Sequence, residues 1–126
     1  MAVPRLGDRG LVAQVAQIVY APPSLLGAPL VIAIVVSGKG RVAFDAGRAA
    51  QNMMLAAWNE GLVSCPNGIA SPESLAELLG LEADEQVQIV PSFGHPGRPR
   101  DPQARPPEEW IRRADRRPLE EVARHL

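Results

Sequence analysis

The spacing of apolar and polar residues predicts alternating helices and strands through most of the chain. Residues 8–19 have apolar side chains at helical spacing and are followed by a Tyr-Ala-Pro-Pro stretch that ends the helix. The β-branched run at residues 30–36 predicts a strand buried on both faces, and residues 86–93 predict a second buried strand. Residues 62–64 predict a short strand, and residues 71–79 predict a helix that begins at Ser-Pro-Glu and ends before a glycine. This order of elements favours an α/β or α+β sheet with helices packed on it.

A longer helix is predicted within residues 44–65. Asp45 is its expected N-cap, and Gly61 is the residue expected to end it. One face of this helix carries small or flexible side chains at spacings of three and four: Ala46, Ala49, Ala50, Met53, Met54 and Ala57. Small side chains on a helix let another helix approach closely. We therefore expect this face to pack either in the core of the chain or against a second subunit.

The length of the chain indicates one domain, and its charge gives no support for binding to nucleic acid or membranes. A chain of 126 residues has room for one domain with a modest core, and a partner surface would add burial. The net charge of −1 gives no general case for binding nucleic acid or membranes. Most basic side chains are arginines in residues 98–124, where acidic residues and prolines accompany them. We expect a single partial domain over residues 1–126, with a core at 1–96 and a solvated, extended arm at 97–126. Phosphate binding by one or two of the arginines is the alternative.

Cysteine and histidine usage predicts neither a disulfide nor a metal site. The single cysteine, Cys65, excludes an intrachain disulfide, and the two histidines, His95 and His125, are far apart in the sequence. The N-terminus lacks the basic-then-apolar layout of a signal peptide, and the apolar run at residues 28–36 is too short to span a bilayer as a helix. We expect a protein of the reducing cytoplasm with no membrane partner.

Three sequence motifs resemble the FMN-dependent nitroreductase family and occur in the order of that family. Residues 45–65 match its D-x-x-x-A-A-Q-N-x-x-L-A-A helix, which is followed by G-L-x-S-C. Residues 78–96 are similar to a segment that reads LLGLPEDE, then V, then LGYP, with His95 where tyrosine is usual. Residues 116–122 resemble the closing R-x-P-L-E-E-V. The resemblance covers roughly residues 28–122. It implies an α/β (α+β) nitroreductase-like sheet flanked by helices.

Two other segments of that family have no counterpart in the chain. The family normally opens with a helix that carries an Arg-Arg-Ser-x-Arg cluster for the FMN phosphate. A Ser-Ala-x-Asn-x-Gln-Pro-Trp segment beside the flavin ring follows. The chain begins at a point that resembles the middle of such a protein, so we expect a fold truncated at the N-terminus. A truncated or mis-started product and a shortened member of the family both fit. The family's dimer also implies a homodimer through the helix Asp45–Trp58.

The resemblance implies where FMN would bind. Cys65, Pro66, Asn67 and Gly68 match the turn that presents backbone amides to the flavin ring, and such donors stabilise the negative charge of the reduced ring. Arg116 matches a basic residue that contacts the FMN phosphate, and a planar guanidinium suits a phosphate. An ordinary turn is the alternative for the four-residue segment. The Cys65 thiol could act as a nucleophile, but nothing nearby would activate it, so we expect it to pack in the core.

In this family the flavin carries out the chemistry, so the resemblance predicts no catalytic side chain. The implied activity is two-electron transfer from NAD(P)H through FMN to a small-molecule acceptor such as a nitroaromatic or a quinone. FMN binding is expected to be weak, because Ala114 stands where relatives often have a basic residue and the N-terminal arginines are missing. Two alternatives stay open. One is a non-catalytic remnant that acts as a dimerising or interaction module without flavin, and the other is binding of a related flavin or deazaflavin without turnover.

Overall fold

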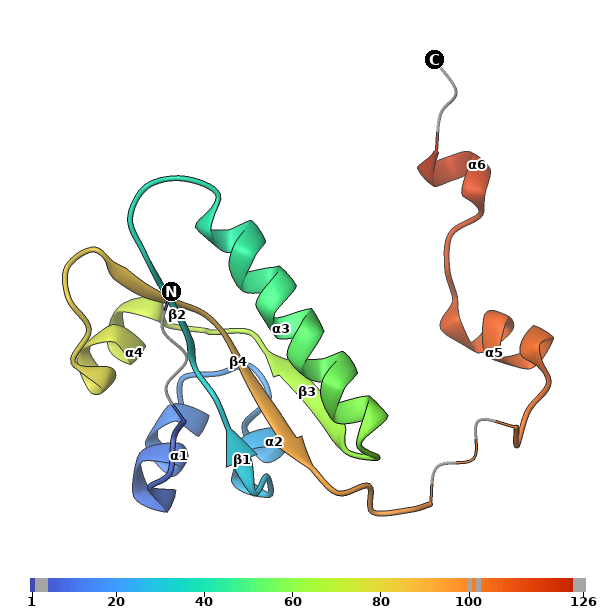
Figure 1. Ribbon diagram of the computed structural model, residues 1–126, viewed down its shortest axis with the longest axis horizontal. Coiled ribbons are helices and arrows are strands. Elements are labelled where there is room, and N and C mark those ends of the chain that lie inside the picture. Colours follow the sequence, from blue (N-terminus) through green and yellow to red (C-terminus); the bar gives the residue numbers. More distant parts are fainter. Residues whose placement is uncertain (2–4, 100, 102, 124–126) are drawn as a thin grey trace. The chain divides into compact units, whose positions relative to one another are not determined.

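The computed structural model describes residues 1, 5–99, 101 and 103–123 of the chain. The chain divides into two compact units, Met1–Pro96 and Gly97–Leu126 (Figure 1). His125, considered above as a metal ligand, and Arg124, at the end of the arginine-rich segment, lie outside the described residues.

The first unit is built around an antiparallel sheet whose central strand is β4 (Glu85–Gly94). One edge of β4 pairs with β1 (Leu30–Val31) and β2 (Ile34–Ser37), and the other edge pairs with β3 (Val63–Asn67). Ser92 of β4 has partners in both β1 and β3, which places these two strands on opposite edges. Every pair of strands that the structure describes is antiparallel, so the predicted helix-flanked sheet is confirmed in its α+β form.

The apolar run predicted as one strand is divided into β1 and β2. The pairing with β4 changes register between Ile34 and Val35, and Ala33 lies outside both strands. The extra residue of this bulge lies in β4, between Val87 and Ile89, and a bulge bends the strand that carries it. The predicted burial of both faces is confirmed, because Ile34 and Val36 pack in one hydrophobic cluster and Val35 packs in another.

Helices cover both faces of the sheet (Figure 1). The long helix α3 (Val42–Asn59) packs on the face to which Ile34 points. The helices α1 (Arg9–Ala16), α2 (Pro22–Leu26) and α4 (Pro72–Leu79) contribute to the cluster on the other face. The buried side chains of that second cluster include Val12, Val15, Leu25 and Leu75 from the helices and Val31, Val35, Val87 and Val90 from the sheet.

The predicted start of the long helix at Asp45 is wrong. The helix begins at Val42, and the N–H groups of Phe44 and Asp45 already donate to the carbonyl oxygen of Arg41, at 2.9 and 3.2 Å. Val42 packs against the cluster formed by α3 and the sheet, and this burial favours the earlier start. The predicted end is confirmed: Gly61 has a φ of 77°, and the N–H groups after the helix bond back into its last turn.

The small-residue face of α3 packs on the sheet of its own chain. Ala46 and Ala50 are buried there, and Ala49 and Met53 pack beside them. Of the two interpretations given by the sequence, core packing therefore applies to this face. The opposite face carries large exposed side chains: Phe44, Leu55 and Trp58.

Helix α1 is shorter than the predicted helix at residues 8–19. After Ala16, the chain extends and pairs with the segment that follows β3. The N–H of Ala70 donates to the carbonyl of Ile18 at 2.8 Å, and the N–H of Tyr20 donates to the carbonyl of Gly68 at 3.1 Å. These nonlocal bonds replace the last predicted turn of the helix. The predicted helix at residues 71–79 is confirmed as α4, which Gly80 ends with a φ of 63°.

The second unit contains two short helices, α5 (Pro107–Ala114) and α6 (Leu119–Val122), which the sequence did not predict. Local contacts stabilise α5. Glu109 forms ion pairs with Arg105 at 3.3 Å and with Arg113 at 3.0 Å, and the Arg105 guanidinium lies 4.7 Å from the centre of the Trp110 ring. Neither helix buries a residue, so the unit has no core of its own among its described residues.

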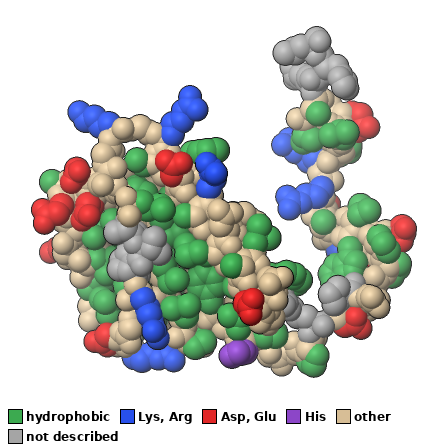
Figure 2. All heavy atoms as spheres, in the orientation of Figure 1, with side chains coloured by type: hydrophobic (Ala, Val, Ile, Leu, Met, Phe, Trp, Pro, Cys, Tyr) green, Lys and Arg blue, Asp and Glu red, His purple; other side chains and the backbone are tan. Residues whose placement is uncertain are grey.

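The outer surface of the first unit is mixed. Figure 2 shows hydrophobic side chains gathered over the sheet on the face in view, with basic side chains around the loop that joins β2 to α3. Within the described part of the chain, no helix combines the length and apolar character needed to cross a bilayer.

Candidate functional site

The segment predicted as a flavin-facing turn lies at the end of β3. The sequence predicted a strand at residues 62–64 and a turn at 65–68, but β3 runs to Asn67. Cys65, Pro66 and Asn67 pair with residues of β4, which is long enough to extend the ladder past the predicted boundary. The predicted turn is therefore wrong for these three residues, and the chain leaves the sheet only at Gly68.

Asn67 is the most highly bonded polar side chain of this region. It is 1% exposed, and its amide nitrogen donates to the carbonyl oxygens of Cys65 at 3.0 Å and Val90 at 2.8 Å. The same nitrogen lies 3.3 Å from the Ser92 hydroxyl. Its carbonyl oxygen accepts a hydrogen bond from the Ser24 hydroxyl of α2. The Asn67 side chain thus joins α2, β3 and β4, and it is directed inward, away from any ligand on the surface.

Gly68 is in close contact with Tyr20. A Cβ atom built on Gly68 would lie 3.1 Å from Cδ2 of the Tyr20 ring, so this position favours glycine on steric grounds. The carbonyl of Gly68 accepts the Tyr20 N–H. Among the described residues, the N–H of Gly68 has no protein acceptor, and Gly68 is exposed. This backbone donor is therefore available to a ligand.

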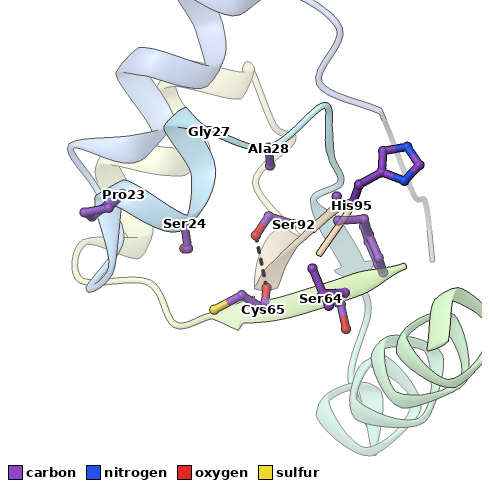
Figure 3. Close-up of a pocket in the computed structure, with 11 residues that line it drawn as sticks. Pro23, Ser24, Gly27, Ala28, Ser64, Cys65, Ser92 and His95 are labelled. Carbon is purple, nitrogen blue, oxygen red and sulfur yellow. Dashed lines mark hydrogen bonds between the residues drawn. The ribbon is translucent and has the colours of Figure 1, made fainter. Parts of the chain in front are cut away.

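A cavity of about 260 Å³ lies along the first residues of β3, from Val63 to Cys65, and the last two residues of the strand and Gly68 lie outside its lining. Its walls come from α2, β3, β4 and the residues just after β4 (Figure 3). Ser24 and Ser92 line it beside the half-buried Cys65, and the Ser92 hydroxyl lies 3.4 Å from the Cys65 carbonyl oxygen. His95 stands at the other end with its ring directed away from Cys65 (Figure 3). The lining is neutral except for these two titratable groups, because it includes no Lys, Arg, Asp or Glu.

The site residues predicted from the sequence fall into two groups. Cys65, Pro66, Asn67 and Gly68 are consecutive, and the first of them lines the cavity. Arg116 lies in the second unit, exposed, in the stretch between α5 and α6. In the part of the chain that the structure describes, Arg116 forms no ion pair with a protein carboxylate.

Sequence reasoning missed three residues of this region, namely Tyr20, Ser24 and Ser92. Tyr20 and Ser24 flank a Pro-Pro pair, which the pattern identified only as the end of a helix. Ser92 lies in a strand predicted to be buried, and a single serine in such a strand does not by itself indicate a binding site. No local signal connects them, because they meet only through the pairing of distant segments. No group of three or more potential metal ligands comes together within the described residues.

Comparison with known proteins identifies the class to which this helix-flanked antiparallel sheet belongs. A sequence model of the nitroreductase family matches residues 8–95. The chain belongs to the nitroreductase family. No curated protein sequence matches it.

Solved structures with this fold include several relatives. A nitroreductase family protein from Clostridium difficile 630 is 18% identical with a TM-score of 0.74, over 98% of this chain and 72% of that one. An FMN-dependent nitroreductase from Clostridium difficile R20291 is 21% identical with a TM-score of 0.70, over 86% of this chain and 69% of that one. A nitroreductase family protein from Clostridium novyi NT is 21% identical with a TM-score of 0.69, over 79% of this chain. The chain spans 64% of that relative, which is less than two thirds of its length.

Proposed function

We propose that this chain forms the flavin-ring side of an FMN-dependent oxidoreductase of the nitroreductase type. The observation that carries the proposal is the N–H of Gly68. It is exposed and has no acceptor among the described residues, and it directly follows the Cys65-Pro66-Asn67 segment that matches the family's flavin motif. The shared fold with a protein named FMN-dependent nitroreductase supports the choice of cofactor.

The chemistry of the donors fits a flavin ring. Pro66 has no N–H, so the backbone donors at this end of β3 belong to the residues after it. The adjoining cavity is neutral and partly apolar, which suits an uncharged aromatic ring. A fixed backbone N–H would stabilise negative charge that develops on such a ring during reduction, and it cannot itself react.

When bound, FMN would supply the redox chemistry by taking two electrons from NAD(P)H and passing them to a nitroaromatic or quinone-like acceptor. The residues of the chain would bind and orient the flavin. The Gly68 N–H would donate to the ring edge, Cys65 would line the wall of the cavity, and Asn67 would hold the Gly68 peptide from inside. By family resemblance, Arg116 would pair with the phosphate. No side chain of this set is assigned a role as acid or base.

Binding of the phosphate is expected to be the weaker half of the interaction. Arg116 is exposed, and Ala114 stands two residues earlier, at a position that is often basic in the family. Each charge-assisted hydrogen bond contributes roughly 1.5–3 kcal/mol, so one missing cation costs about one to two decades in affinity.

We further propose a homodimer through α3. The face of α3 that points away from its own sheet exposes Phe44 by 63%, Leu55 by 55% and Trp58 by 55%. Large exposed apolar side chains on one helix face are typical of an interaction surface.

The same surface favours one alternative function, a dimerising or interaction module that binds no flavin. This alternative uses the exposed residues of α3 but makes no use of the Gly68 N–H. We propose no nucleic-acid or membrane partner, and we propose the reducing cytoplasm as the location.

Anaerobic reduction of FMN tests the proposed activity. The full chain is mixed with FMN and either NADH or NADPH, and bleaching of the oxidised flavin band is followed against FMN and the nicotinamide without protein. Faster bleaching with one nicotinamide, followed by recovery of the band on adding a quinone, is the expected result. Bleaching no faster than in the protein-free control, at protein concentrations that bind FMN, would contradict the activity and support flavin binding without turnover. A chain that binds no FMN would support the interaction module.

A further inference from the structure

We propose that Asn67 and Ser24 are positioning residues, which hold the Gly68 peptide in place for the flavin ring. The inference rests on the proposed function. It adds that the affinity and the reduction potential of the flavin depend on a hydrogen-bond network centred on the buried Asn67 side chain, which lies behind the Gly68 peptide.

The network satisfies a buried amide almost completely. The Asn67 nitrogen has two protons, and three acceptors lie within reach: the carbonyls of Cys65 and Val90 and the hydroxyl of Ser92. Cys65 belongs to the same strand, whereas Val90 and Ser92 belong to β4. A side chain held at both strands can rotate little, so the backbone that carries it is also held.

Ser24 extends the network to α2. Its hydroxyl donates to the Asn67 side-chain oxygen and lies 2.7 Å from the carbonyl of Ala21. A hydroxyl has one proton, so the Asn67 contact competes with a bond inside the first turn of α2. When the proton is donated to Asn67, the contact links the helix to the strand.

Two neighbouring contacts converge on Gly68. Tyr20 bonds to the Gly68 carbonyl at 3.1 Å, and Ser24, four residues later in the chain, bonds to the side chain of Asn67, the residue just before Gly68. The N–H of Gly68 belongs to the peptide that joins Asn67 to Gly68. Ser24 holds the side chain of the residue before this peptide, and Tyr20 holds the carbonyl of the residue after it, so the segment from Tyr20 to Ser24 restrains the peptide from both ends.

Two substitutions of Ser24 distinguish the positioning role from a general effect on stability. Ser24→Ala removes the hydroxyl, Ser24→Thr retains it, and Ser74→Ala is the control, since Ser74 is an exposed serine that bonds to Ser71 in α4. Each full-length protein is titrated with FMN and with riboflavin by fluorescence quenching, and the reduction potential of the bound flavin is measured. Thermal unfolding of each protein is recorded alongside.

We expect Ser24→Ala to weaken binding of both ligands by roughly threefold to tenfold, as expected for one lost hydrogen bond. The potential of the bound flavin should become more negative, because a misdirected N–H stabilises the reduced ring less. Ser24→Thr should restore both quantities, and Ser74→Ala should change neither. Asn67→Ala should have a larger effect than Ser24→Ala. If Asn67→Ala does not fold, the two Ser24 variants decide the matter.

Three results would contradict the inference. Parent affinity and potential in Ser24→Ala, in a parent that binds flavin, would leave the proposed function standing and remove the positioning role. Equal losses in Ser24→Ala and Ser24→Thr would show that the hydroxyl is not the cause. A parent chain that binds neither riboflavin nor FMN would contradict the proposed function, and the inference would fail with it.

Discussion

Tyr20 and Gly68 are in contact through both backbone and side chain. The Tyr20 N–H donates to the Gly68 carbonyl at 3.1 Å, and an added Cβ on Gly68 would lie 3.1 Å from the tyrosine ring. Tyr20 is otherwise 76% exposed, so its ring can yield to a larger neighbour more easily than a core side chain could. The pair brings the end of the first helical segment to the end of β3, beside the proposed flavin site.

Gly68→Ala should therefore cost a small amount of stability, about 1 kcal/mol, by forcing the Tyr20 ring to move. In a Tyr20→Ala background the same substitution should cost nearly nothing, because the ring is no longer there. A double-mutant cycle measured by urea unfolding gives the coupling. Additive costs in the cycle would show that the tyrosine ring is not what restricts this position.

Asn67→Leu should destabilise the first unit by roughly 2–3 kcal/mol, because the buried carbonyls of Cys65 and Val90 lose their donor. Asn59→Ala is the matched control. Asn59 is an exposed residue at the end of α3 whose side chain makes one long contact, 3.4 Å to Glu60. Its replacement should change stability by no more than about 0.5 kcal/mol. Equal effects of the two substitutions in urea unfolding would contradict the assigned network.

Arg116→Ala should weaken FMN binding by roughly 1.5–3 kcal/mol and leave riboflavin binding unchanged, since riboflavin lacks the phosphate. Arg116→Lys should lose part of that energy, because a point charge does not reproduce the guanidinium fork. Arg117→Ala is the control from the same segment, because successive side chains of an extended chain point to opposite sides. Equal FMN affinities for the parent and Arg116→Ala, in fluorescence titrations, would remove Arg116 from the phosphate site.

Leu55→Glu should shift the protein from dimer to monomer in sedimentation or light scattering, because it places a charge in the proposed interface on α3. Leu26→Glu is the matched control: Leu26 is 50% exposed on α2, compared with 55% for Leu55. It should leave the oligomeric state unchanged. A parent protein that is already monomeric at micromolar concentration would contradict the dimer directly.

The sequence predicts best those parts of the fold whose signals are local. Gly61 and Gly80 end their helices as predicted, because a left-handed residue after a helix favours glycine wherever it occurs. The burial of both faces at residues 34–36 also follows from the β-branched run alone. In contrast, the start of α3 at Val42 depends on packing against the sheet, which no capping residue announces.

The candidate site depends on nonlocal pairing, which explains what the sequence could not predict. The resemblance implied a turn at residues 65–68, and proline cannot donate to a ladder, yet Pro66 pairs with Pro91 of β4. Asn67 looked like a turn residue, and its burial follows only once β4 and α2 lie beside it. The resemblance to a family indicated this segment as a flavin site, which stays a prediction. The structure adds that the Asn67 side chain is internal and that the Gly68 N–H has no acceptor among the described residues.

The most direct test of the central claim is equilibrium dialysis of the full chain against riboflavin, which reports on the ring site without the phosphate. We expect riboflavin to accumulate on the protein side, with stoichiometric saturation and with competition from FMN for the same site. It also predicts that Gly68→Pro, which removes the backbone donor, lowers the retained riboflavin more than Gly97→Pro does in the second unit. Equal riboflavin concentrations on both sides of the membrane at saturating protein would contradict the claim that this chain carries a flavin site.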